Sequence, residues 1–352
     1  MEKFRDKIFN EEVFEKYLET LPSTKENSLI KSGLFTNVSG YKARMNEQTG
    51  GYQVVEPIKG RIGGDPVNYD GNTNIPKGSE RDTFVQKKVC YGRAKAFGEY
   101  DFASDITGAN FMAEAQEVKD YWDEERQKTV LSILKGIFSM TGGVDGQFVD
   151  KHTYDITEAT DTNLSADSLN RAAQKALGDK KAKLDVIFMH SAVSTNLEGL
   201  NLIDFLKYTD AAGIQRDLTI GTFNGRLVIV DDDMPTTDVE ETSEGADDGY
   251  TAYTSYVFQK GFFEYENIGA TKPSELARDP YDKGGKTDLI TRVREMIVPK
   301  YISYKGTGSV SPTNANFETG SNWELVNNDK TGANKVYIDD KLIPVARIIS
   351  RG

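Results

Sequence analysis

Apolar residues in the segment 107–139 recur at steps of three and four, which is the spacing of one face of an α-helix. Asp105 or Thr107 can cap the start of this helix, and Thr141-Gly142-Gly143 can end it. At 1.5 Å per residue the helix would be about 50 Å long, with its apolar stripe buried. Arg126 alone interrupts that stripe, which consists of Phe111, Ala115, Val118, Trp122, Val130, Leu134 and Ile137.

The segment before this helix, residues 33–99, has no helical stripe and contains many turn-forming residues. Val54-Val55 on one side and residues 83–91 on the other favour strands. We predict a long two-stranded excursion with a polar, glycine-rich tip, lying on another surface because an isolated hairpin is marginally stable. A disordered linker is the alternative that the composition allows. Apolar residues in the returning segment favour the hairpin, namely Phe84, Val85, Val89, Tyr91 and Phe97.

After the long helix, short apolar runs alternate with short helical patterns, which is typical of a compact α/β unit. One helix is predicted at 166–177 with Gly178 as its stop, and another from Val193 to about Leu206. Strands are predicted at 184–189, 225–230, 250–258, 288–304, 335–338 and 342–349.

The first residues form a separate pattern. Asn10 can cap a helix that Pro22 ends, with Val13, Phe14, Tyr17, Leu18 and Leu21 on one face. The mixed, mostly acidic charges disfavour a membrane-surface helix. The helix could pack on its own domain, or it could be an arm that docks on a neighbouring subunit through the loose tether that follows it. The pattern does not decide between them.

The composition narrows the function classes. The chain has 352 residues with 38% hydrophobic residues, no apolar run long enough to span a bilayer, and no signal-peptide pattern after Met1. A single cysteine, Cys90, excludes an internal disulfide framework and fits a reducing cytoplasm. The formal net charge of −12 argues against dedicated nucleic-acid recognition, which usually shows a basic footprint.

Catalytic motifs are missing. His152, His190 and Cys90 are too few for the usual zinc clusters, and His190 is expected to be a helix cap or a packed core residue. Gly285-Lys286-Thr287 imitates the end of a phosphate-binding loop, but Pro280 replaces a required glycine, so we interpret it as an ordinary loop. The segment 161–165 resembles a calcium loop whose turn glycine and bidentate acid are both absent. No nucleophile elbow occurs.

An acid-rich segment, residues 231–248, is the best candidate for a cation site. It begins at Asp231-Asp232-Asp233 and contains no Lys or Arg. Clustered carboxylates can bind calcium or magnesium, whereas the simpler interpretation is a solvated loop in which like charges repel. We therefore predict no catalytic, cofactor-binding or metal-ligating residues.

Short segments spread over most of the chain resemble one known family, through their order and spacing rather than through any single motif. They are Ser32-Gly33, Gly50-Gly51 with Pro57, 97–101, Tyr121-Trp122, 134–138, 188–191, 225–232, 256–258 with Gly261, 275–279, 311–314 and 322–325. Together they resemble the major capsid protein of tailed bacteriophages, of the Hong Kong 97 type. One departure is Val298-Pro299-Lys300-Tyr301, where many relatives have a His-Pro-x-Gly turn.

This resemblance implies an α+β fold of the Hong Kong 97 type, divided as follows: N-terminal arm 1–45, extended β-hairpin loop 46–100, peripheral domain with a spine helix 101–148, axial domain 149–275, and return strands of the peripheral domain with C-terminal strands 276–352. It implies a structural protein, without enzymatic activity, whose pentamers and hexamers close an icosahedral head around double-stranded DNA. Because no scaffolding region precedes the arm, a separate scaffolding protein is expected. Portal and decoration proteins are the other expected partners. The location would be the virion, after synthesis in the host cytoplasm, with no membrane association.

Two alternatives stay open at this point. An encapsulin-like nanocompartment shell shares the fold type and would enclose an enzyme cargo. An α/β enzyme that uses scattered Asp, Glu and Tyr residues belongs to a different class, and fold alone does not decide function.

Overall fold

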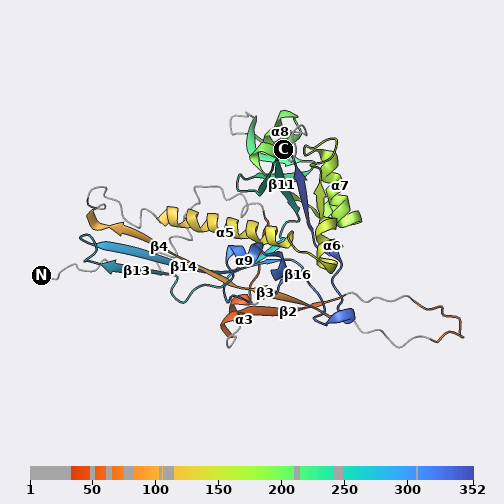
Figure 1. Ribbon diagram of the computed structural model, residues 1–352, viewed down its shortest axis with the longest axis horizontal. Helices are drawn as coiled ribbons and strands as arrows, with labels where there is room; N and C mark the ends of the chain where they lie inside the picture. Colours follow the sequence, from red (N-terminus) through yellow and green to blue (C-terminus); the bar gives the residue numbers. More distant parts are fainter. Residues whose placement is uncertain are drawn as a thin grey trace.

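The computed structural model describes residues 33–47, 52–60, 66–74, 83–102, 105, 115–209, 215–240, 249–306 and 308–352. The helix predicted from Asn10 lies outside these residues, as does the part of the long helix predicted at 107–114. Two sheets and one projecting hairpin make up most of the described structure (Figure 1).

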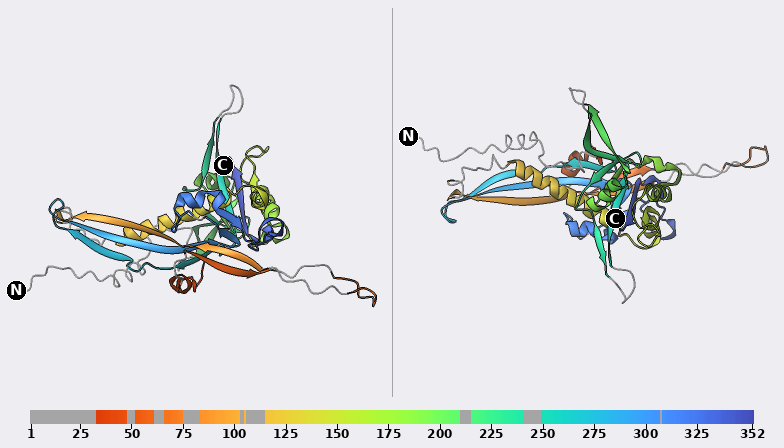
Figure 2. Two further views of the ribbon diagram at one scale, coloured as in Figure 1. Left: turned by 60° about the horizontal axis from the view of Figure 1, so that its bottom comes forward. Right: turned by 90° about the horizontal axis from the view of Figure 1, so that it is seen from above.

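A five-stranded sheet forms the long axis of the body (Figures 1 and 2). Its central strand is β14, which pairs with β4 along one edge and with both β12 and β13 along the other, always antiparallel. The short β1 adds to β12 in parallel. The strands are β1 (Phe35–Asn37), β4 (Tyr91–Tyr100), β12 (Phe263–Asn267), β13 (Ser274–Asp279) and β14 (Lys286–Pro299).

Helix α5 (Ala115–Ile137) runs along this sheet, as the apolar stripe predicts (Figure 1). Val118, Val130, Leu134 and Ile137 are buried, whereas Trp122 is only half-buried and donates its indole N–H to Thr291 Oγ1 on β14 at 3.1 Å. The helix ends at Ile137, earlier than predicted. Gly142 and Gly143, which we expected to end it, have positive φ and begin the next helix, α6 (Gly143–His152).

The second sheet has eight strands in the order β5-β17-β11-β6-β9-β8-β7, with β10 also paired to β11. Helices α7 (Ala166–Leu177) and α8 (Ser191–Gly199) pack on it, and their apolar faces share a core with β6, β11 and β17. The strands are β5 (Thr153–Asp155), β6 (Val186–Met189), β7 (Ile203–Thr209), β8 (Gln215–Phe223), β9 (Arg226–Val230), β10 (Thr236–Val239), β11 (Tyr250–Phe258) and β17 (Val345–Ser350).

Strands β2 (Gln53–Lys59) and β3 (Thr83–Val89) form the projecting hairpin, in register from Gln53↔Val89 to Lys59↔Thr83. Short elements lie around its base and beside α5. They are α3 (Tyr41–Glu47), β15 (Ile302–Tyr304), α9 (Asn314–Glu318), β16 (Trp323–Leu325) and the 3₁₀ turns Gly320–Asn322 and Gly332–Asn334. Two further 3₁₀ turns, Gly178–Lys183 and Asp340–Leu342, contact α7.

The predicted hairpin is confirmed, but the excursion is shorter than the predicted loop 46–100. Its last part is β4, a ten-residue strand of the five-stranded sheet, and α3 interrupts the segment that we expected to lack helices. Tyr91, at the start of β4, is buried in the main core. The reason is that β14 offers β4 a complete antiparallel ladder, from Lys286↔Tyr100 to Glu295↔Tyr91.

The predicted domain boundary at 275 and the return of the C-terminal strands do not match the sheets. β12 already belongs to the five-stranded sheet. β17 lies in the eight-stranded sheet instead, between β5 and β11, where Val345 and Ile348 are fully buried. The chain thus crosses between the sheets after β11 and crosses back before its last strand.

Three local predictions were also wrong. The helix predicted to reach Leu206 ends at Gly199, because Asn201 takes a left-handed conformation (φ 53°) and β7 follows. Residues 335–338 are not a strand, since only Tyr337 makes an isolated bridge, to Asn327. Lys286 and Thr287, expected in a loop, are the first residues of β14. The helix 166–177, with Gly178 after it, and the strands at 225–230 and 250–258 are confirmed within one residue.

Candidate functional site

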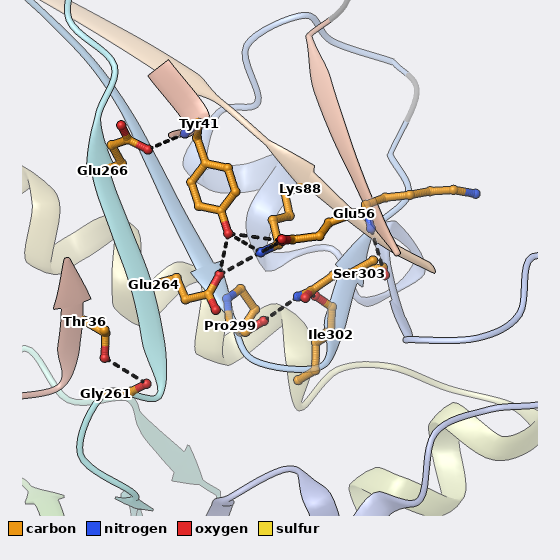
Figure 3. A network of polar contacts seen from close by, with 12 residues as sticks. Thr36, Tyr41, Glu56, Lys88, Gly261, Glu264, Glu266, Pro299, Ile302 and Ser303 are labelled. Carbon is orange, nitrogen blue, oxygen red and sulfur yellow. Dashed lines mark hydrogen bonds and ion pairs between the residues drawn. The ribbon is translucent and has the colours of Figure 1, made fainter. Parts of the chain in front are cut away.

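The base of the hairpin contains a buried cluster of charged and polar side chains (Figure 3). The side chain of Lys88 on β3 is only 2% exposed, and its Nζ lies 2.5 Å from Glu56 on β2 and 2.7 Å from Glu264 on β12. Lys88 also donates to the hydroxyl of Tyr41 on α3, and that hydroxyl donates to Glu264 at 2.9 Å. Four elements that are distant in sequence are therefore joined at one ammonium group.

The groups of this cluster hold each other in their usual charge states. Burial alone would raise the pKa of Glu56, but the hydrogen bond and positive charge of Lys88 lower it below its usual value. Burial lowers the pKa of Lys88, but its hydrogen bonds to the two carboxylates raise it by more. The net pKa is therefore raised, and Lys88 stays protonated. Burial raises the pKa of Tyr41 to about 12, so its hydroxyl remains a donor. Each buried charge has a partner, as buried charges require.

Gln86, two residues before Lys88 on the same face of β3, attaches the hairpin to the body in a second way. Its buried amide donates to the carbonyls of Pro299 and Ile302 at 2.9 and 3.0 Å. Next to it, the backbone N–H of Lys87 donates to Ser303 Oγ at 3.2 Å. The hairpin base is thus held firmly at the turn between β14 and β15, so the rest of the hairpin projects from a fixed origin.

The far part of the hairpin, residues 66–74 (here called the hairpin end), is exposed at every position. It nevertheless has its own local structure. The carboxylate of Asp70 accepts hydrogen bonds from the N–H groups of Asn72 and Thr73 and from the side chains of Thr73 and Asn68. These backbone hydrogen bonds lower the pKa of Asp70. The turn presents Tyr69 outward with 90% of its surface exposed.

The histidines, the cysteine and the calcium-loop-like segment that the sequence singled out all have structural roles in the fold. His190 is the N-cap of α8, as predicted, and its Nδ1 accepts from the N–H of Ala192 at 3.1 Å. His152 is buried against Phe148 with Nδ1 2.6 Å from the carbonyl of Val345. Cys90 is buried between β3 and β4, and burial raises the pKa of its thiol. Asp161 and Ser165 make a turn and the N-cap of α7.

The acid-rich segment is partly a hairpin, because β10 pairs with β11. Asp231 Oδ1 accepts from the N–H of Asp233, and Asp238 accepts from Thr251, while residues 241–248 lie outside the described structure. Over the described ranges, no group of three or more His, Cys, Asp or Glu side chains is placed to hold a metal ion. In the same part of the chain, no helix is long and apolar enough to cross a membrane.

Sequence reasoning did not find the cluster around Lys88. A signal was present, because Phe84, Gln86 and Lys88 alternate along one face of β3 and all three are buried. A glutamine and a lysine at inward positions of a strand require polar partners in the interior. Glu264, however, lies 176 residues away along the chain, beyond the reach of a local pattern.

Comparison with known proteins agrees with this picture of a structural subunit. The major capsid protein of Bacillus phage SPP1 is 28% identical over 312 residues, covering 88% of this chain and 89% of the relative. No protein-family model matches the chain. The chain therefore has the Hong Kong 97-type α+β capsid fold and a structural capsid role.

Solved structures support the fold at much lower sequence identity. The capsid of cyanophage Pam1 aligns with a TM-score of 0.55 at 9% identity, covering 94% of both chains. The capsid of Helicobacter pylori bacteriophage KHP30 aligns with a TM-score of 0.52 at 11% identity over the full length of both chains. This fold accounts for the two sheets, the long helix and the projecting hairpin. The curated capsid relative from phage SPP1 does not favour the enzyme and nanocompartment alternatives.

Proposed function

We propose that copies of this chain assemble into pentamers and hexamers of an icosahedral head that encloses double-stranded DNA. The five-stranded sheet with α5 would be the peripheral domain and the eight-stranded sheet the axial domain. The observation that carries the proposal is the hairpin. Its base is fixed to the body by Lys88 and Gln86, while its end is fully exposed. A locally ordered segment that buries nothing in its own chain is suited to contact with another copy.

The acidic composition suits this function. A wall with a formal net charge of −12 repels DNA phosphates on average, which favours enclosure without sequence-specific binding. Scaffolding, portal and decoration proteins are the proposed partners, and the host cytoplasm is the proposed place of synthesis before the protein enters the virion. These parts of the proposal follow from the family resemblance.

The test is to shorten the hairpin without disturbing its base. Lys59 pairs with Thr83 at the last described rung of the hairpin, so residues 60–82 can be replaced by a short Gly-Ser turn. This change keeps Val54, Phe84 and Tyr91 in the core. The variant should be soluble, should unfold cooperatively, and should not close into shells. The wild-type chain should give megadalton particles in gradient sedimentation and electron microscopy.

Two results would contradict the proposal: a wild-type chain that forms no shells even when it is produced together with the other head proteins of its phage, or a shortened variant that forms normal shells under the same conditions. The contents of purified particles provide the second readout. Nuclease-protected double-stranded DNA in particles from infected cells agrees with a phage head, and a protein cargo in its place supports a nanocompartment.

A further inference from the structure

A groove of about 390 Å³ lies beside the hairpin base, where β3 passes into β4. Its floor is formed by Met45, Tyr52 and Cys90, and Val310 stands at its rim with 73% of its surface exposed. This volume is in the range of sites that bind a small organic group, and a single aromatic side chain fits within it. The apolar lining favours burial of a ring.

Three arginines line the same groove: Arg93, Arg292 and Arg294. Arg292 is paired with Glu275 at 2.9 Å. Arg93 donates to the carbonyl of Gly92 and to the side-chain oxygen of Asn314, both neutral acceptors. Among the described residues neither Arg93 nor Arg294 forms an ion pair, although the charge of Glu125 acts on Arg93 at longer range. Both half-buried guanidinium groups therefore lack a carboxylate in direct contact at this groove. An occupant that combines an aromatic ring with a negative charge is complementary to it.

The hairpin end has this combination. Tyr69 is 90% exposed and is followed directly by Asp70, and residues 66–74 contain no Lys or Arg. Asp70 accepts hydrogen bonds from the N–H groups of Asn72 and Thr73, so the turn next to Tyr69 has less backbone entropy to lose on binding. Exposed, pre-ordered tyrosines are frequent anchors of protein interfaces.

The occupant must come from another copy, because the hairpin carries its own end away from its own base (Figure 1). We propose that Tyr69 of one copy inserts into the groove beside Cys90 of the next copy, with Asp70 facing Arg93 and Arg294. This contact uses different surfaces on the two copies, so a joined pair still has one free groove and one free hairpin end. Repeated around an axis, such a contact closes a ring. The inference rests on the proposed function and specifies the contact that holds neighbouring copies.

A disulfide between copies tests the contact directly. In a Cys90→Ala background, Tyr69→Cys and Val310→Cys are combined, and shells are assembled in reductant and then oxidised. The expected result is a ladder of crosslinked species on a non-reducing gel, up to closed rings of five or six copies. The matched control pairs Tyr281→Cys with Val310→Cys. Tyr281 is 92% exposed but lies in the turn between β13 and β14, so this pair should remain monomeric.

The contribution of the Tyr69 ring and that of the charges on Asp70 and Arg294 are tested with separate variants. Tyr69→Ala should raise the protein concentration needed for shells about tenfold or more, and Tyr69→Phe should have a much smaller effect. Arg294→Gln should weaken assembly and reduce its salt dependence, and Asp70→Asn should do the same. Normal shells without the 69–310 ladder would overturn this contact and leave the proposed function standing. If the wild-type chain forms no shells even together with the other head proteins of its phage, the proposed function itself is wrong.

Discussion

Arg126 of α5 and Glu295 of β14 form a two-point ion pair, with Nη2 2.5 Å from Oε1 and Nε 3.2 Å from Oε2. Glu295 is buried, and it also accepts hydrogen bonds from the hydroxyls of Tyr91 and Tyr265. Asp123, one turn earlier on α5, contacts Arg126 Nη1 at 2.7 Å. The residue that interrupts the apolar stripe is therefore the point at which the long helix is attached to the five-stranded sheet.

Arg126→Met should destabilise the subunit by about 3–5 kcal/mol, because it leaves the carboxylate of Glu295 buried without a counter-charge. The free energy of unfolding is measured by urea denaturation of dissociated subunits. Lys128→Met is the control: Lys128 is exposed and, among the described residues, its ion pair is with Glu125 on the same helix, so the change should stay within about 0.5 kcal/mol. The double variant Arg126→Met/Glu295→Met should recover part of the loss. Equal effects of Arg126→Met and Lys128→Met would contradict this account.

Gly136, near the end of α5, should not tolerate a methyl group. A Cβ there would lie 1.8 Å from the carbonyl oxygen of Phe317 and 2.6 Å from Trp323 Nε1. These two groups are themselves hydrogen-bonded in the core, at 2.6 Å, and cannot move independently. Gly136→Ala should therefore cost about 3 kcal/mol, as overpacking of a rigid site does.

Gly146 on α6 is the matched control for Gly136→Ala. A Cβ at Gly146 would meet its nearest neighbour at 3.5 Å, which is ordinary contact, and its φ is not positive. Gly146→Ala should stabilise the subunit by up to about 1 kcal/mol, through helix propensity. Thermal unfolding of the two variants should shift in opposite directions, and a shift in the same direction would show that the packing around Gly136 is looser than these distances imply.

The features predicted correctly from sequence are those that local periodicity determines. The stripe of α5, the helix 166–177 with Gly178, and the β2–β3 hairpin each depend on spacings of a few residues. The errors share one cause, which is that the deciding interaction is distant in sequence. Arg126 interrupts the stripe in sequence because its partner Glu295 lies 169 residues away, and β4 cannot be told from the loop because its partner residues on β14 lie even farther along the chain.

The other wrong predictions of secondary structure concern short apolar runs. The run 203–206 fits a helix or a strand equally well, and only the left-handed Asn201 before it shows that the helix has ended. Residues 335–338 contain the short apolar run Val336-Tyr337-Ile338. They meet the segment 326–328 through only two backbone hydrogen bonds and the single bridge of Tyr337, which is too little for a strand. For the candidate site, sequence identified the hairpin and failed to identify Lys88, Glu56, Glu264 and Tyr41, whose partnership depends on the completed fold.

Leu134 and Trp122 should differ in their effect on stability, although sequence places both on one stripe. Leu134 is 1% exposed and belongs to the main core, so Leu134→Ala should cost about 2–5 kcal/mol. Trp122 is half-buried, and its N–H is paired with Thr291 at the edge of the core. Trp122→Phe should therefore cost only about 1 kcal/mol, the value of one hydrogen bond. A larger loss for Trp122→Phe than for Leu134→Ala, in the same urea titration, would contradict this order.

The buried ring of His152 should make subunit stability depend on pH near neutrality. The carbonyl of Val345 can only accept, so Nδ1 carries the proton, and Nε2 has no hydrogen-bond partner within the described structure. Burial lowers the pKa of His152, although the Val345 carbonyl and Asp340 oppose the shift. The unfolded chain, with a histidine pKa of about 6.5, therefore binds more protons than the folded chain in this range, so stability falls as the pH drops below about 6.5.

His152→Gln keeps a donor for Val345 and removes the titrating ring, so the slope of unfolding free energy against pH should flatten between about pH 7 and 5.5. This window lies above the range in which carboxylates with lowered pKa values, such as Glu56, lose their contribution. His190→Gln is the control, because His190 is a partly exposed helix cap and the wild-type slope should remain. Identical slopes for His152→Gln and His190→Gln, in urea titrations at matched pH values, would show that the buried ring is not the group that titrates.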